Sequence, residues 1–110
     1  MRSLFALCLS VFVLTVGSAA AEDEIAVSVV IKDHKFSPAE VSVPANRRVV
    51  VTVSNEDATP EEFESHDLNF EKVIPGNTKG TVRFGPIEPG RYTFFGEFHE
   101  DTAQGTVVVK

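Results

Sequence analysis

Hydrophobic and polar residues alternate along several short stretches of the chain, a pattern typical of β-strands that bury one face. In residues 48–54 the alternation places Val49, Val51 and Val53 on one face. In residues 25–31 it does the same for Val27, Val29 and Ile31. Strands are predicted on this basis at residues 25–31, 41–43, 48–54, 81–84, 91–98 and 105–110.

Turn residues punctuate these stretches, and no segment shows a long helical period. About seven short strands with regular turns predict an all-β fold, a single Greek-key β-sandwich. The exception is residues 55–79, an irregular and acidic connection in which a turn or two of helix could form within residues 56–72. Long loops of this kind usually lie at an end of a sandwich and carry function.

The N-terminal 21 residues have the features of a secretory signal peptide. Arg2 precedes the apolar run Leu4 to Val16, and small residues follow it at positions 19–21. The run is short for a membrane span and ends at a cleavage pattern. A lipoprotein is rejected because bulky Leu7 precedes Cys8 and the apolar run continues beyond it. We expect residues 22–110 to form one domain that is exported to the periplasm, with no membrane insertion after cleavage.

The composition of residues 22–110 limits the possible chemistry. Without Arg2, nine basic and sixteen acidic residues remain, so the net charge changes from −6 to −7. An acidic surface argues against nucleic-acid partners and is compatible with cations. The only cysteine and the only methionine of the chain are Cys8 and Met1, so the predicted domain has neither a disulfide nor a sulfur ligand.

Three segments resemble the cupredoxin family, and together they cover nearly all of the predicted domain. They are "IKDHKFSPAEVSVPANRRVVVTVSNED", the Glu62–Glu64 stretch with the following "EKVIPG", and "GPIEPGRYTFFGEFHEDTAQGTVVV". The chain is similar in particular to the EfeO-type cupredoxin-like domains, small periplasmic proteins that accompany bacterial iron-permease systems. The resemblance implies the cupredoxin sandwich and a metal site in the loop after residues 91–98.

The ligand positions implied by this resemblance are mostly not occupied by the family's ligands. Gly96 stands at the cysteine position, Ala103 near the methionine position, and Glu62 at or next to the first histidine, so that only His99 is retained. Because a blue-copper centre requires a thiolate, such a centre is excluded. Gly96 itself is interpreted as a bulge or a close backbone approach.

A harder metal site of oxygen and nitrogen ligands is still possible. If residues 91–99 are extended, Glu97 and His99 share the face opposite the aromatic residues, and an extended Glu62–His66 segment places Glu62, Glu64 and His66 on one side. Carboxylates with imidazoles suit iron, manganese, zinc or Cu(II). The predicted metal ligands are therefore Glu62, His99, Glu97, Glu64 and His66, where His66 is auxiliary.

Each of these residues also has an ordinary structural explanation. Glu97 and His99 could be a polar pair on a solvent-facing strand, and Glu62 and Glu64 could belong to a solvated acidic loop. His34, in the turn "KDHKF", is interpreted as a surface residue. The phenylalanines expected in the core are Phe36, Phe63, Phe70, Phe84, Phe94 and Phe98.

The leading hypothesis is an exported metal-binding protein that assists iron uptake by binding, oxidising or delivering iron. The resemblance implies a membrane iron permease and a periplasmic iron-binding protein as partners. The alternatives are a Cu(II) carrier using His99, His66 and carboxylates, and a metal-free docking module. No nucleophile or catalytic constellation is present in the sequence, so an enzyme activity is not predicted beyond an accessory role in ferrous iron oxidation.

Overall fold

The structure is a computed structural model, and it describes residues 24–110. The predicted signal peptide, residues 1–21, and the predicted start of the exported domain at Glu22 lie outside the described residues. Within residues 24–110, no helix has the length and apolar character needed to cross a membrane.

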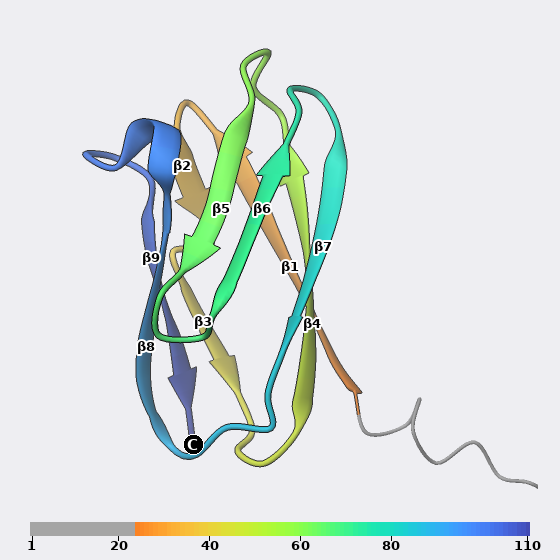
Figure 1. The fold of residues 1–110 in the computed structure, drawn as a ribbon, viewed down its shortest axis with the longest axis vertical. Coiled ribbons are helices and arrows are strands. Elements are labelled where there is room, and N and C mark those ends of the chain that lie inside the picture. Colours follow the sequence, from red (N-terminus) through yellow and green to blue (C-terminus); the bar gives the residue numbers. More distant parts are fainter. Residues whose placement is uncertain (1–23) are drawn as a thin grey trace, which may run out of the picture.

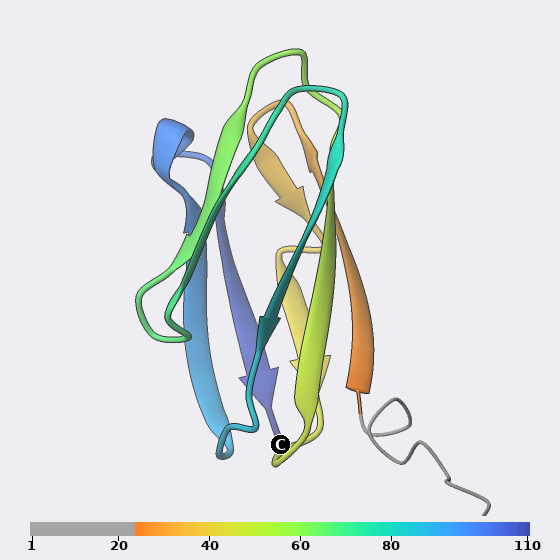
Figure 2. The same ribbon diagram turned by 45° about the vertical axis from the view of Figure 1, so that its right-hand side comes forward.

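Nine strands form two sheets that pack face to face (Figures 1 and 2). The first sheet contains, in spatial order, β2 (Lys35–Ser37), β1 (Glu24–Lys32), β4 (Arg48–Asn55) and β7 (Lys79–Phe84). The second contains β3 (Glu40–Val43), β9 (Gln104–Val109), β8 (Gly90–Gly96), β5 (Glu61–Ser65) and β6 (Phe70–Ile74). The predicted all-β sandwich is therefore confirmed, with nine strands where about seven were expected.

The strands pair mostly in antiparallel fashion, as in other β-sandwiches. Two pairs are parallel: β1 with β4, and β3 with β9. The chain crosses between the two sheets five times, in the connections β2–β3, β3–β4, β4–β5, β6–β7 and β7–β8. These crossings bring strands that are distant in the sequence into one sheet.

The core lies between the sheets and consists of the residues that alternate inward. Val49, Val51 and Val53 are all buried, as the periodicity predicts, and so are Val29 and Ile31. Phe36, Phe63 and Phe94 make edge-to-face contacts in the centre, with ring centroids 5.0–5.6 Å apart. Such contacts add to the stabilisation from apolar burial.

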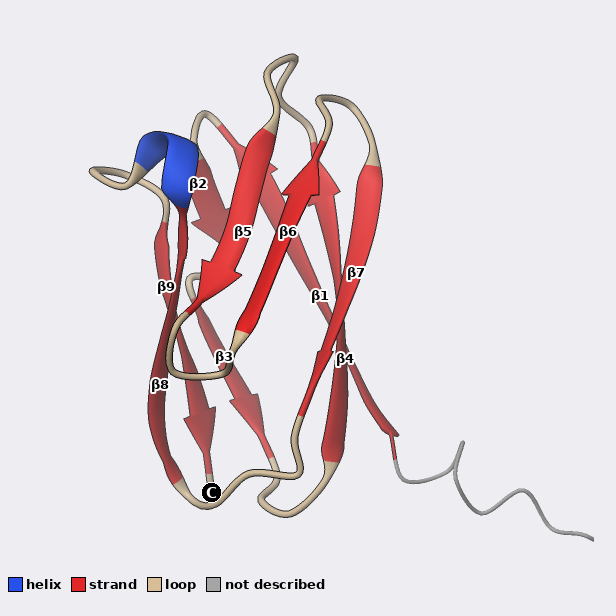
Figure 3. Ribbon diagram, viewed as in Figure 1, coloured by secondary structure: helices blue, strands red, loops and turns tan. Residues whose placement is uncertain are grey.

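Two predictions about local structure were wrong. The acidic connection 55–79 is not irregular throughout, because β5 and β6 form a hairpin within it. The second error concerns the end of the 91–98 strand. β8 ends at Gly96, and Glu97–His99 form a single turn of 3₁₀ helix, η1, the one helical element between residues 24 and 110 (Figure 3). This turn directs Phe98 outward, so that Phe98 is 47% exposed and does not belong to the core.

Four connections gather at one end of the sandwich (Figure 1). They are the β1–β2 turn, the β4–β5 loop, the β6–β7 loop and the segment from η1 to β9. The segments that carry the predicted ligands Glu62, Glu97 and His99 therefore lie near this end.

Candidate metal site

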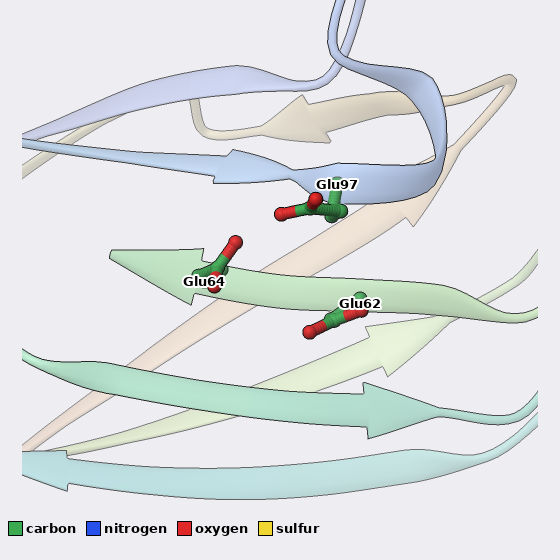
Figure 4. A group of neighbouring side chains, drawn as sticks. All are labelled: Glu62, Glu64 and Glu97. Carbon is green, nitrogen blue, oxygen red and sulfur yellow. The ribbon is translucent and has the colours of Figure 1, made fainter. Parts of the chain in front are cut away.

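Three carboxylates meet on the second sheet where β5 lies beside η1. One oxygen each from Glu62, Glu64 and Glu97 lies within 4.8 Å of the others. Figure 4 shows Glu62 and Glu64 on β5 and Glu97 facing them from the start of η1. All three were predicted as ligands from the sequence, and the structure brings them together.

Strand alternation explains why two of these carboxylates share a face. Phe63 points into the core and is 1% exposed, so its neighbours Glu62 and Glu64 point to the outer face of the sheet. Glu64 has Glu71 of β6 and Phe95 of β8 as direct register partners. These flanking side chains explain how an outward-facing glutamate becomes buried.

Proton sharing between neighbouring carboxyl groups raises the pKa of two of them. A side-chain hydrogen bond with Glu71, which forms when one of the two groups is protonated, raises the pKa of Glu62 to about 7, and desolvation and charge repulsion add to this effect. The side chain of Glu97 does the same for Glu64, whose pKa is raised to about 7. Two neighbouring carboxylates resist ionising together, because each negative charge disfavours the next. A cation bound between them would remove this conflict.

Glu64 is the least satisfied member of the group. Its residue is only 8% exposed, and its Oε2 atom has no hydrogen-bond partner. An oxygen of Glu64 is directed toward Glu97, which when ionised is also an acceptor and offers no donor (Figure 4). A buried carboxylate oxygen without a donor is costly unless a proton or a metal ion compensates it.

On the inner side of β5, Glu61 forms a separate arrangement with His99. Glu61 is 1% exposed, and its Oε2 lies 2.5 Å from Nδ1 of His99. Its Oε1 accepts hydrogen bonds from the backbone N–H groups of Phe98, at 2.9 Å, and of Glu62, at 3.1 Å. Glu61 thus fastens the start of β5 to η1. Glu61 was not among the ligands predicted from the sequence, although its parity with Phe63 places it on the core face.

His34 covers the other side of this pair. Its ring stacks on that of His99, with centroids 3.5 Å apart and an angle of 11° between the planes. His34 is held in the tight β1–β2 turn, where Asp33 and His34 both have positive φ. The carboxylate of Asp57 accepts hydrogen bonds from the backbone N–H of each of these two residues. The interpretation of His34 as a simple surface residue therefore misses its contact with His99.

The position implied for the cysteine of a blue-copper site is filled in a different way. A Cβ atom added to Gly96 would lie 2.6 Å from Cδ of Glu61 and 2.8 Å from Cβ of Ala103. The backbone N–H of Gly96 donates to the carbonyl of Ala103. The positions Gly96, His99 and Ala103 thus converge on one place as the resemblance implies, and the Glu61 carboxylate occupies the space. The close-approach interpretation of Gly96 is confirmed.

The ligands predicted from the sequence do not lie at one site in the structure. Glu97 and His99 were expected on one face of a strand, and this was wrong, because η1 turns Glu97 toward the outer carboxylates and His99 toward Glu61. His66 joins neither arrangement. Its ring lies 5.2 Å from that of Phe95, on the outer face.

Comparison with known proteins identifies relatives of most of the chain. A family model described as "Cupredoxin-like domain" matches residues 4–109. An uncharacterized protein of Rickettsia prowazekii (strain Madrid E) is 46% identical over 83 residues, which are 76% of this chain. The match spans 66% of the length of that relative.

Solved structures show the same fold at low sequence identity. An apo copper binding protein, determined by NMR, superposes with a TM-score of 0.71 at 13% identity, covering 80% of this chain and 89% of that chain. The metal binding domain of the Cu(I) exporting P-type ATPase CopA of Streptococcus pneumoniae gives 0.69 at 16% identity, covering 80% and 87%. An oxidized amicyanin mutant gives 0.62 at 20% identity, covering 76% and 81%.

The family model covers almost the entire chain, and the structural matches agree with the two-sheet topology. Gly96, His99 and Ala103 converge in the connection between β8 and β9. The chain belongs to the cupredoxin-like domain family.

Proposed function

We propose that this protein is an exported metal-binding member of its family that holds a hard or borderline divalent cation on Glu62, Glu64 and Glu97, with Fe(II) as its cargo. The observation that carries this proposal is the buried Oε2 of Glu64, which has no hydrogen-bond partner and belongs to a cluster of carboxylate oxygens. Oxygen ligands of this kind suit Fe(II) and Mn(II) better than Cu(I).

Electrostatics supports a cation at this place. The crowded carboxylates raise the pKa of Glu62 and of Glu64 to about 7, so near neutral pH the cluster holds protons that a divalent ion can replace. The absence of cysteine and methionine from residues 24–110 removes the soft ligands that would favour Cu(I).

We further propose that the bound iron serves uptake, in company with a membrane iron permease and a periplasmic iron-binding protein. The support is the resemblance to EfeO-type domains together with the oxygen-rich ligand set. The protein would bind Fe(II) and deliver it, and a ferroxidase step is not required by this site. The Cu(II) carrier based on His99 and His66 has less support, because these two histidines lie in different surroundings.

Anaerobic titration of the metal-stripped, purified protein with Fe(II) and Mn(II) tests the binding step. We expect binding tighter than about 1 mM, and a loss of affinity of at least about tenfold in Glu64→Gln, because the amide removes one charged ligand oxygen. Glu88→Gln, an exposed acid in the β7–β8 connection, is the matched control and should bind as the unchanged protein does. Equal affinity in Glu64→Gln would remove Glu64 from the site.

The uptake role is tested in cells that lack the chain and carry either version of it. Uptake of radioactive ferrous iron under iron limitation should be restored by the unchanged protein and by Glu88→Gln, and not by Glu64→Gln. Normal uptake in the complete absence of the protein would refute the transport role and leave the binding result intact.

A further inference from the structure

We propose that His99 and His34 form a second metal site, separate from the outer carboxylates, which takes a borderline divalent cation such as Cu(II) or Zn(II), and that Glu61 positions His99 for this purpose. The ligand atom of His99 is Nε2, because Nδ1 faces the Glu61 carboxylate. The proposal does not depend on the outer site, since it uses different residues on the opposite face of β5.

The Glu61–His99 pair has the form of a carboxylate that orients a ligating imidazole. Metal-bound histidines commonly donate their second ring N–H to a carboxylate, which fixes the tautomer and increases the basicity of the ligand nitrogen. With Nδ1–H donating to Glu61, Nε2 of the neutral ring keeps its lone pair. Nε2 has no hydrogen-bond partner among residues 24–110. The Glu61 side chain is 2% exposed, whereas that of His99 is 26% exposed and reaches solvent.

An open cavity of about 510 Å³ lies beside these rings. His34 and His99 line it, and so do the acidic residues Glu100 and Asp101, which take no part in the outer carboxylate cluster. A metal ion held by imidazole nitrogen would therefore find oxygen ligands and water within the same cavity. Mixed nitrogen and oxygen ligands favour Cu(II) and Zn(II), and Cu(II) most strongly by intrinsic affinity.

His34 supplies the second nitrogen. Its backbone is fixed by Asp57, but its side chain is only partly buried and, besides the stack on His99, makes one long polar contact, 3.4 Å from Nε2 to the Thr59 hydroxyl. Two stacked rings cannot both direct a lone pair at one ion, so the His34 ring must rotate out of the stack on binding. The rotation gives up the stack on His99 and the long contact to Thr59, and the new metal–nitrogen bond must compensate for both.

The three histidines of the chain provide a direct test by NMR. Zn(II) is added to the purified protein, and the imidazole ring resonances of His34, His66 and His99 are followed. We expect the first equivalent to shift the resonances of His34 and His99 and to leave those of His66 unchanged. A shift of His66 alone, or no shift below about 1 mM Zn(II), would overturn the proposal.

Variants with a Cu(II) probe separate the ligands from the positioning residue. His99→Ala, and His34→Asn, which tolerates the positive φ of the turn, should each weaken Cu(II) binding by at least about tenfold and reduce the nitrogen hyperfine structure in the EPR spectrum. His66→Ala is the matched control and should change neither. If the spectrum of the His34→Asn, His99→Ala double variant equals that of the unchanged protein, the site is refuted.

Glu61→Gln tests the positioning role. The amide can still accept from Nδ1–H but lacks the negative charge, so Cu(II) affinity should fall by about 10–100-fold while the nitrogen hyperfine structure is retained. Unchanged affinity in a folded Glu61→Gln variant would limit Glu61 to a structural role. Glu64→Gln should leave this Cu(II) site intact, so that the second site and the outer Fe(II) site can fail independently.

Discussion

Glu61 and His99 lie 38 residues apart in the chain and are joined by a 2.5 Å contact between a buried carboxylate oxygen and an imidazole nitrogen. This contact closes the end of the sandwich, because the same carboxylate also accepts backbone hydrogen bonds from Glu62 and Phe98. Strand β5 lies between the carboxylates on the outer face of its sheet and the histidine at the end of the sandwich.

Removing the Glu61 side chain should destabilise the fold. Glu61→Ala leaves three donors without their acceptor in a buried place: two backbone N–H groups and the Nδ1–H of His99. A buried donor left without its acceptor typically costs about 1–3 kcal/mol, so we expect a loss of at least about 2 kcal/mol in the free energy of unfolding in urea. Glu88→Ala is the control and should change stability by less than about 0.5 kcal/mol. A loss of that small size in Glu61→Ala would show that the pair contributes little.

Gly96 should not accept a side chain while Glu61 is present. In Gly96→Ala the new methyl group would lie 2.6 Å from Cδ of Glu61 and 2.8 Å from Cβ of Ala103. Overpacking of this kind costs about 1–3 kcal/mol. Thermal unfolding of Gly96→Ala, Glu61→Ala and the double variant measures the coupling, and the double variant should be less destabilised than the sum of the two single variants. Strict additivity would mean that the methyl group is accommodated elsewhere.

The outer carboxylates should make the metal-free protein less stable as the pH rises. The pKa values of Glu62 and Glu64 are raised from 4.5 to about 7 in the folded state, so the folded protein binds more protons than the unfolded chain between these values. Their contribution to stability is therefore fully present below pH 4.5 and is lost as the pH rises through about 7. Glu64→Gln should flatten this dependence in thermal unfolding measured from pH 5 to pH 8. An equally steep dependence in Glu64→Gln would assign it to other groups.

Metal should reverse that trend. Fe(II) or Mn(II) bound only by the folded state raises stability by about 2.7 kcal/mol when the free ion is at about 100 times its Kd. At one fixed ion concentration we expect this gain to be larger at pH 8 than at pH 5, because protons compete with the ion for the same carboxylate oxygens and so raise its Kd at low pH. Thermal unfolding with and without Mn(II), followed by removal of the ion with a chelator, measures it. A gain that does not depend on pH would argue against ligation by Glu62 and Glu64.

Asp57 should govern the acid limit of stability and the position of His34. The backbone N–H of His34, and secondarily that of Asp33, lower the pKa of Asp57 below its ordinary value of 3.8. A lowered pKa means that the carboxylate stabilises the fold above pH 3.8 and that this contribution is lost as the pH falls through its lower folded value. Asp57→Ala should therefore reduce the acid dependence of unfolding and broaden the NMR resonances of the His34 ring. Unchanged His34 resonances would show that the turn holds itself.

Many features of the fold could be predicted from local sequence pattern. The valines of β4 alternate strictly, and burial of Val49, Val51 and Val53 follows from a strand that hides one face. The hairpin of β5 and β6 was missed because its outward positions carry charged side chains and its inward positions include Glu61, so that the segment has no simple apolar alternation. Phe98 was wrongly predicted to be in the core because the strand alternation was extended beyond Gly96, where β8 ends and η1 begins.

For the candidate site, the sequence alone determined which chemistry is possible. It excluded a thiolate or thioether ligand in residues 24–110 and supplied carboxylates and imidazoles at positions that the cupredoxin resemblance marks, including Glu62, Glu64, Glu97 and His99. These conclusions follow from residue identity and need no coordinates.

Only the tertiary structure decided which of these groups meet. The 3₁₀ turn η1 directs Glu97 to one face of β5 and His99 to the other. The hydrogen bond that Asp57 accepts from the backbone N–H of His34 holds the His34 ring over His99. The physical reason is that metal ligation depends on distances of a few ångströms between side chains on different strands, whereas sequence periodicity reports only which face of its own strand a residue occupies.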